Sequence, residues 1–344
     1  MLSPRSETIL KSIVGQYIAR AVPVPSQRII NDYELAVSPA TIRNEMAHLE
    51  KGGYITRPHP SAGSIPSDKG YRYYVETLSA IELPLAEQLL ISHLFHQVER
   101  ELEEWLSLAA ALTAQLVQNV AIVTIPKPAN SQFRHLELVA IKDSLALVVL
   151  VLHGARLRQQ LITFDQIISQ PELTTMANKL NIAYSGLARA KISANKVKLS
   201  PTEQQVTDCL LKIMQDEDEQ EYEHSSLDGL HFTLNQPEFR RGQRGQALME
   251  LVDDRSLLRS IAPGERGSQG VQVIIGKENR AETIQDCSVV ISQYGLPEEA
   301  VGIVGVVGPT RMPYARTISA VDYLSSVLSQ LVAELYGGKP QSIL

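Results

Sequence analysis

The stretch SPATIRNEMAHLEKGG, residues 38–53, constrains the fold more than any other part of the chain. Ser38 can cap a helix because its hydroxyl accepts hydrogen bonds from free N–H groups of the first turn. Pro39 suits the first helical position, which needs no N–H, and the glycines at 52–53 can end the helix. Apolar residues recur at spacings of four and three, which predicts one narrow apolar face formed by Ile42, Met46 and Leu49.

The opposite face of this predicted helix carries residues that suit DNA. Small side chains allow close approach, while guanidinium and amide groups fit base edges and phosphates. The candidate DNA contacts on the helix are Ser38, Ala40, Thr41, Arg43, Asn44, His48 and Lys51. Of these, Arg43 and Asn44 are the candidates for reading base edges. An ordinary amphipathic surface helix would give the same pattern, so the neighbouring segments must decide.

The segments before residue 38 predict two further helices. Residues 5–20 place isoleucines on one face, and the prolines within 21–25 end that helix because they cannot continue it. Ser26 can cap a second helix, and residues 36–37 leave room for a tight turn. Two helices, a turn and a third helix form the helix-turn-helix arrangement, whose last helix enters the major groove of DNA.

The segment after Gly53 predicts two short strands joined by a loop. Residues 54–57 predict a short strand, and 58–63 are rich in residues that form turns. Residues 64–66 predict the second, returning strand, after which Ser67 can cap a further helix. Two strands directly after a recognition helix make a winged helix-turn-helix, and a plain hairpin is the alternative. In a wing, contacts to the sugar–phosphate backbone, which position a protein without reading sequence, are expected from Arg57, His59, Ser61 and Ser64.

Charge is distributed unevenly along the chain. The formal net charge is −6, yet residues 1–75 hold nine Lys or Arg against six Asp or Glu. A mildly basic N-terminal module on an acidic body agrees with DNA binding confined to one end.

The compartment follows from cysteine usage and hydropathy. Cys209 and Cys287 lie far apart and form no C-x-x-C pair, which predicts buried thiols in a reducing, cytoplasmic setting. The N-terminus has no signal-peptide pattern, and no apolar run is long enough to cross a bilayer. We therefore expect no membrane association.

The run SPATIRNEMAHLEKGGYI, followed by PHPSAGSIPSDKGYRYYVE, resembles the signature of the HrcA family, the heat-inducible transcription repressors of bacteria. The resemblance covers the whole chain. It implies a homodimer that binds an inverted-repeat operator in double-stranded DNA, represses chaperone operons and loses activity on heat shock. By resemblance, residues 38–51 form the recognition helix. The family commonly has glycine at Pro25, threonine at Pro60 and arginine at Ser64, and the missing arginine removes one expected phosphate contact.

The resemblance also implies how the repressor is switched. In the family, a chaperonin of the GroEL type usually keeps the repressor folded, and misfolded protein that competes for chaperonin relieves repression. Chaperonin is therefore an expected partner, although no residue pattern marks a contact with it. Direct thermal unfolding of the dimer is the alternative switch.

The remainder of the chain alternates between helical and β patterns. Residues 84–118 predict one long helix, because their apolar residues recur close to the heptad rhythm of a helix packed against another helix. From Val120 the period falls to two, which predicts four successive strands of an antiparallel sheet. Helical patterns at 171–245 interrupt the strands, which resume at Gly270 before a terminal helix.

These patterns and the resemblance predict a multidomain α+β fold. An N-terminal winged helix-turn-helix is followed by a long linking helix and a GAF-like antiparallel sheet domain with an inserted α/β dimerisation domain. The residues alone indicate the interruption, whereas the GAF-like character and the dimerising role come from the resemblance. The expected boundaries are 1–80 for the winged helix, 84–118 for the linking helix, 119–168 with 246–344 for the GAF-like domain, and 169–245 for the inserted domain.

The sequence predicts no enzyme, no cofactor and no metal site. Residues 270–277 have the wrong spacing for a phosphate-binding loop, and Glu278 stands where a magnesium-binding hydroxyl is needed. Nothing else in the sequence converges on the evenly spaced His93, His96 and Glu99. The segment before the last helix is expected to expose Arg311 and Arg316 in a loop.

Two other functions stay open at this point. One is a winged-helix regulator that binds a small effector in the GAF-like domain, although the strongly apolar strands favour a filled core. The other is a structural or chaperone-associated interaction protein. A steep salt dependence of DNA affinity would oppose that second alternative.

Overall fold

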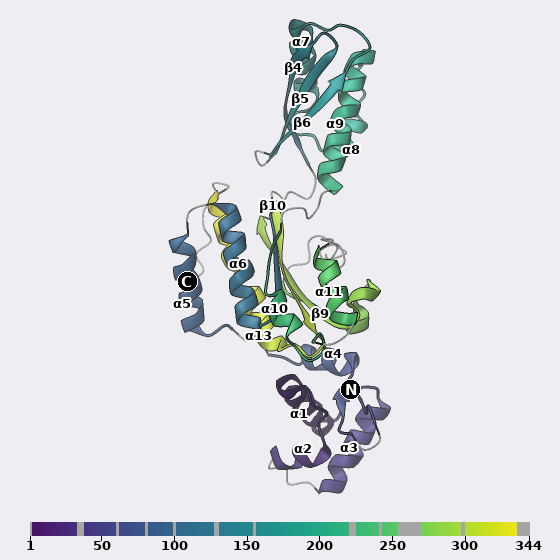
Figure 1. The fold of residues 1–344 in the computed structure, drawn as a ribbon, viewed down its shortest axis with the longest axis vertical. Coiled ribbons are helices and arrows are strands. Elements are labelled where there is room, and N and C mark those ends of the chain that lie inside the picture. Colours follow the sequence, from purple (N-terminus) through teal and green to yellow (C-terminus); the bar gives the residue numbers. More distant parts are fainter. Residues whose placement is uncertain are drawn as a thin grey trace. The chain divides into compact units, whose positions relative to one another are not determined.

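The computed structural model of the chain describes residues 2–32, 38–59, 62–79, 82–98, 101–126, 131–153, 156–219, 225–240, 243–253, 270–296 and 300–335. The chain forms two compact units, each a mixture of helices and antiparallel strands (Figure 1). The first unit comprises 1–125, 224–295 and 302–344, and the second comprises 126–223 with 296–301. The protein is therefore a multidomain α+β protein.

The N-terminal part of the first unit contains the helices that the sequence predicts. They are α1 (Pro4–Arg20), α2 (Ser26–Asp32), α3 (Pro39–Lys51) and α4 (Asp68–Glu76). Between α3 and α4, β1 (Ile55–Thr56) and β2 (Ile65–Pro66) pair antiparallel, with Ile55 opposite Pro66. The expected turn at 36–37 lies outside the described residues.

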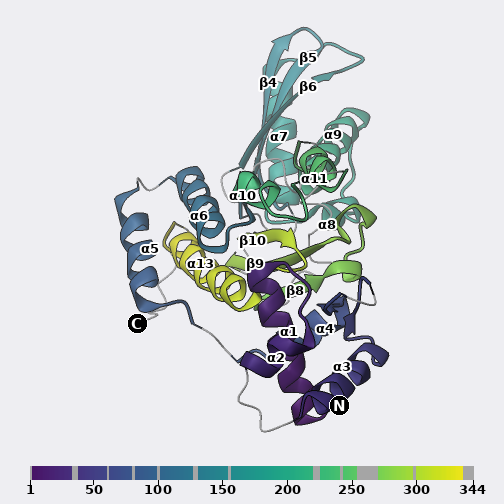
Figure 2. The ribbon, with the colours of Figure 1, turned by 60° about the horizontal axis from the view of Figure 1, so that its bottom comes forward.

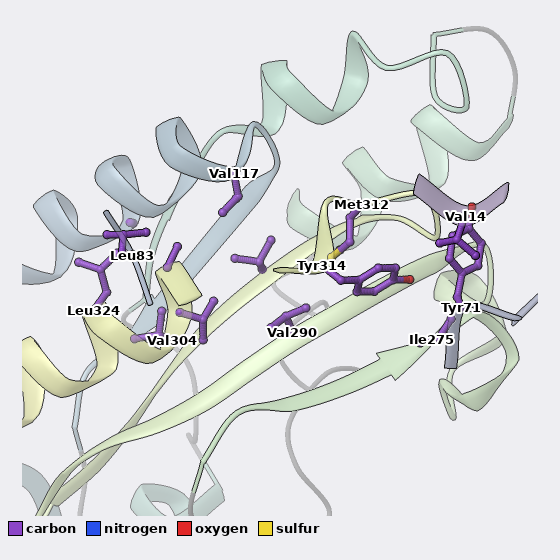
Figure 3. Close-up of a cluster of buried hydrophobic side chains, with 14 of the residues drawn as sticks. Val14, Tyr71, Leu83, Val117, Ile275, Val290, Val304, Met312, Tyr314 and Leu324 are labelled. Carbon is purple, nitrogen blue, oxygen red and sulfur yellow. The ribbon is translucent and has the colours of Figure 1, made fainter. Parts of the chain in front are cut away.

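A five-stranded sheet forms the centre of the first unit, in the order β7-β3-β10-β9-β8. Its strands are β3 (Val120–Thr124), β7 (Ser225–Asp228), β8 (Gln272–Ile275), β9 (Cys287–Leu296) and β10 (Ala300–Pro309). The terminal helix α13 (Tyr314–Leu335) packs with α6 against the sheet, and the short helices α10 (Leu230–Leu234), η1 (Gly276–Glu278), η2 (Glu282–Ile284) and α11 (Gln243–Asp253) complete the unit. Val290, Val304 and Leu324 are fully buried between sheet and helix (Figure 3), so apolar side chains fill this core.

The predicted long helix at 84–118 is two helices, α5 (Leu85–Gln97) and α6 (Leu102–Val117). The backbone of Val98 is extended, with ψ of 144°. The break lets both helices reach α13, since α6 packs along it while Tyr323 of α13 donates to the Gln88 carbonyl of α5. The spacing of apolar residues indicates which face of a helix is buried. It does not indicate that the helix is interrupted and that the chain folds back between two helices.

The second unit contains a separate three-stranded sheet, β4 (Phe133–Lys142), β5 (Leu145–Leu152) and β6 (Arg156–Thr163), in sequence order. Helices α7 (Gln170–Tyr184), α8 (Arg189–Ser193) and α9 (Pro201–Glu219) accompany it. The prediction of one sheet from Val120 onward was therefore wrong. Strand β3 is buried at every position between β7 and β10, whereas β5 alternates between buried and half-buried residues. This compact unit begins at Pro126, earlier than the boundary expected for the inserted domain.

Two amide side chains of α7 bond the free edge of β4. Asn181 accepts from the Leu136 N–H at 2.7 Å and donates to the Leu136 carbonyl at 3.0 Å. Gln170 accepts from the Ala140 N–H at 2.7 Å and donates to the Leu138 carbonyl at 2.8 Å. The side-chain amides thus satisfy backbone groups that a further strand would otherwise bind.

Candidate nucleic-acid interface

Helix α3 presents the polar face that its sequence predicts. The Ser38 hydroxyl accepts from the Thr41 N–H at 3.2 Å, and Pro39 stands in the first turn. The buried residues of the helix are Ile42, Met46 and Leu49. On the other side Thr41 is half-buried, and the remaining candidate contacts are all exposed: Ser38, Ala40, Arg43, Asn44, His48 and Lys51. Helix α3 lies on the side of the N-terminal helices away from the five-stranded sheet (Figures 1 and 2).

The acidic residue in the middle of α3 is turned away from this exposed face. The Ser6 hydroxyl of α1 donates to Glu45 Oε2 at 2.5 Å. This hydrogen bond between α1 and α3 supplements the apolar packing of α3 against α1 and α2. The Glu45 carboxylate therefore binds α3 to α1. In this position it does not face an anion that approaches Arg43 and Asn44.

The strand pair brings Arg57 to the C-terminal end of α3. Its Nε lies 3.3 Å from Glu50 Oε2, and the two side chains are 36% and 38% exposed. A pair so exposed to solvent contributes about 0–1 kcal/mol, so Glu50 does not hold Arg57 firmly. His59 is also exposed beyond the strand. Ser61 lies outside the described residues.

Ser64 does not lie on this surface, contrary to the sequence-based expectation. Its side chain is fully buried, because its backbone pairs with Val24 through two hydrogen bonds of 2.8 and 2.9 Å. This bridge closes the strand pair onto the segment between α1 and α2. The wing contact expected at Ser64 is therefore replaced by a contact inside the protein.

Helix α4 fastens the strand pair to the end of α3. The Ser67 hydroxyl donates to the Gly53 carbonyl at 2.6 Å, and Lys69 Nζ donates to the Gly52 carbonyl at 2.8 Å. The Lys69 ammonium also lies 4.4 Å from the ring centroid of Tyr54, within range of a cation–π contact. Sequence analysis did not single out Lys69, because its partners lie seventeen and fifteen residues away in the chain.

Glu7 joins α1 to α4. The carboxylate accepts hydrogen bonds from Lys11 at 2.7 Å and from the Tyr73 hydroxyl at 3.1 Å. These hydrogen bonds, first that of Lys11 and then that of Tyr73, hold the pKa of Glu7 below its usual range. Glu7 therefore stays ionised at neutral pH as an internal partner of the basic N-terminal module.

The described residues offer no arrangement for metal binding. They contain no group of three or more His, Cys, Asp or Glu side chains that could hold a metal ion. His93 and His96 bond neighbours on their own helix, and Glu99 lies outside the described residues. Burial, and secondarily the charge of Asp286, raises the pKa of the Cys287 thiol to about 12, so the thiol stays protonated. None of the described helices is both long and apolar enough to span a membrane.

Comparison with known proteins gives matches over the whole chain. The family model described as HrcA protein C terminal domain matches residues 103–318. A heat-inducible transcription repressor HrcA of Dehalococcoides mccartyi is 55% identical over 99% of each chain. One from Roseiflexus castenholzii is 42% identical over 98% of this chain and 96% of that one. A crystal structure of a hypothetical protein shares the fold with a TM-score of 0.58 at 24% identity, covering 97% of this chain and 98% of that one.

Replacing two helical glycines by alanine should have opposite effects on stability. A Cβ on Gly70 of α4 would lie 2.1 Å from the Tyr54 carbonyl oxygen, whereas a Cβ on Gly15 of α1 meets nothing within 4 Å. We expect Gly70→Ala to lower the free energy of unfolding by about 1–3 kcal/mol through overpacking. Gly15→Ala should raise it by up to about 1 kcal/mol, because alanine favours a helix. Urea denaturation checks both, and equal shifts would contradict the close packing of α4 on the Tyr54 carbonyl.

Proposed function

The chain belongs to the HrcA family of heat-inducible transcription repressors, and we propose that it represses heat-shock (chaperone) operons by binding an inverted-repeat operator as a homodimer in the cytoplasm. The observation that carries the proposal is the exposed polar face of α3, opposite a fully buried apolar face. Helices α1–α3 and the β1–β2 pair agree with a winged helix-turn-helix in which α3 is the recognition helix.

The exposed residues divide by the contacts that their chemistry suits. Arg43 and Asn44 carry a guanidinium and an amide that can bind base edges with two hydrogen bonds. Lys51, Arg57 and His48 follow towards the end of α3 and the strand pair, where they suit phosphates. We infer that the first two read the operator and that the others hold the helix on the backbone.

Replacing Arg43 should weaken binding to the operator more than binding to scrambled DNA. Arg43→Ala removes a bidentate donor, and we expect a loss of about 1–3 kcal/mol on the operator with relaxed specificity at one base pair. Binding is measured by fluorescence anisotropy on both DNAs at two salt concentrations. An equal loss on both DNAs would rule out base reading by Arg43, and no operator preference in the unmodified protein would overturn the proposed function.

Replacing Lys51 supplies the matched comparison on the same helix. Lys51→Ala should weaken binding to both DNAs alike, because a phosphate contact carries no sequence information. The slope of log K against log salt should fall in magnitude by about one unit. An unchanged slope would show that Lys51 does not contact phosphate.

We propose that the second unit is the dimerisation domain and the five-stranded sheet the GAF-like domain. One face of the β4-β5-β6 sheet packs on its helices, while the other face holds apolar residues that are exposed or half-buried. Cross-strand neighbours on that face are Val139, Leu147 and Leu161, with Val151 beside Leu157. A second copy of the same face would cover it in an isologous contact, and the bonded β4 edge favours this face over edge-to-edge pairing.

A charge on this sheet face should convert the dimer to monomers. Leu161 is 57% exposed on the apolar face, and Ile182 is 87% exposed on α7 of the same unit. We expect Leu161→Asp to halve the mass measured by light scattering and to weaken operator binding, because burying an unpaired carboxylate opposes association. Ile182→Asp should leave the dimer intact. A dimer that survives Leu161→Asp would place the interface elsewhere.

Heating should release the operator, and chaperonin should restore binding. We propose that a GroEL-type chaperonin keeps the repressor in its binding form, so that misfolded protein competing for chaperonin lifts repression. The repressor is heated mildly, cooled and assayed on the operator with and without chaperonin and ATP. Rescue by chaperonin supports this switch. Loss on heating without rescue would favour direct thermal unfolding of the dimer instead.

A further inference from the structure

Arg72 of α4 joins the N-terminal helices to β8 and η1, which lie far away in the sequence. Its guanidinium donates to both carboxylate oxygens of Glu278, with Nε 2.9 Å from Oε1. It also donates to the Val273 carbonyl of β8 at 2.6 Å. Burial would raise the pKa of Glu278, but the hydrogen bonds from Arg72 and from the Ile275 N–H outweigh it and lower this pKa. Glu278 is therefore charged beside Arg72 at neutral pH.

Asp68 makes a second contact at the start of the same helix. Its Oδ2 accepts from the Lys277 backbone N–H at 3.0 Å. Gly276 beside it has φ of +55°, and a Cβ there would lie 2.4 Å from the Asp68 carboxylate. The carboxylate therefore sits directly on the backbone of η1, in a place that only glycine leaves open.

Arg311 makes a third contact, near the C-terminal end of α1. Its Nη1 donates to the Ile18 carbonyl at 3.0 Å, and its Nε donates to Glu238 at 2.6 Å. Its Nη2 donates to Gln236 at 3.1 Å. The side chain is only 14% exposed, so Arg311 is an internal contact and not the exposed residue that the sequence suggested.

An apolar cluster lies among these three polar contacts. Val14 of α1 and Tyr71 of α4 meet Ile275 of β8 and Tyr314 of α13, and all four are buried (Figure 3). The rings of Tyr71 and Tyr314 have centroids 5.8 Å apart. The hydrophobic effect itself is non-directional, whereas hydrogen bonds to several separate points further restrict the orientation of the two surfaces.

We propose that Arg72–Glu278, Asp68–Lys277 and Arg311–Ile18 fix the angle of the recognition helix on the sheet, and thereby set the half-site spacing that the dimer accepts. The inference rests on the proposed DNA-binding function. Both helices of a dimer must enter major grooves separated by a defined number of base pairs. Each added base pair turns a half-site by about a tenth of a helical turn, so a fixed angle excludes the wrong spacings.

The test measures affinity for operators whose spacer is lengthened or shortened by one base pair. The unmodified protein should prefer one spacing by about tenfold or more, because a mismatched spacing prevents both half-sites from binding at once. Arg72→Ala and Glu278→Ala should each reduce this preference to about threefold, and their combination should add little since the two residues act as one pair. Affinity for scrambled DNA should stay unchanged. The charge exchange Arg72→Glu with Glu278→Arg should restore part of the preference.

Arg316 provides a matched control away from the joint. Like Arg72, it donates to one carbonyl and one carboxylate, Leu116 at 2.8 Å and Glu87 at 3.1 Å, but its partners lie on α6 and α5. Arg316→Ala should keep the spacing preference. Circular dichroism at the assay temperature checks folding, and Glu278→Gln, which keeps the side-chain size, replaces any alanine variant that unfolds.

The possible results separate the two proposals. An unmodified protein without operator preference overturns the proposed function. A repressor that binds its operator, but whose spacing preference survives Arg72→Ala and Glu278→Gln, overturns the inference alone. Equal losses of preference in Arg72→Ala and Arg316→Ala would show general destabilisation and would also overturn it.

Discussion

Burial of the apolar face of α3 is the interaction on which the N-terminal module depends. Ile42, Met46 and Leu49 are almost completely removed from solvent, and each contributes about 1.5–3 kcal/mol by its burial. This burial fixes the rotation of α3 about its axis. Arg43 and Asn44 are therefore turned outward as a consequence of packing, before any contact with a partner.

The joint with the five-stranded sheet combines two kinds of force. Tyr71 and Tyr314 supply apolar contact, while Arg72, Asp68 and Arg311 bind defined atoms around it. Arg72 and Glu278 are 29% and 38% exposed, so this ion pair adds little to stability. The polar contacts instead restrict the orientation of the N-terminal helices on the sheet, because hydrogen bonds weaken steeply when their geometry changes.

The sequence predicted structural features correctly where the interacting residues are close in the chain, and it failed where a residue's partner lies far away in the chain. The Ser38 cap, the Ser67 cap and the apolar stripe of α3 all arise within one or two turns of helix, and the structure confirms them. Ser64 was expected to contact the sugar–phosphate backbone, because its partner Val24 lies forty residues earlier in the chain and the sequence gives no sign of the contact. Strand β7 was missed because SSLD is polar and stands at a sheet edge, where burial leaves no pattern.

The amides of Gln170 and Asn181 along β4 have a consequence for aggregation. In partly unfolded chains, an open strand edge can serve as a template on which another chain pairs, which leads to aggregation. In this protein the backbone N–H and carbonyl of Leu136, the Leu138 carbonyl and the Ala140 N–H are already hydrogen-bonded within the same chain. While this unit keeps its fold, these backbone groups are not open to pairing with a strand of another chain, so this edge offers no template for aggregation when other parts of the protein loosen.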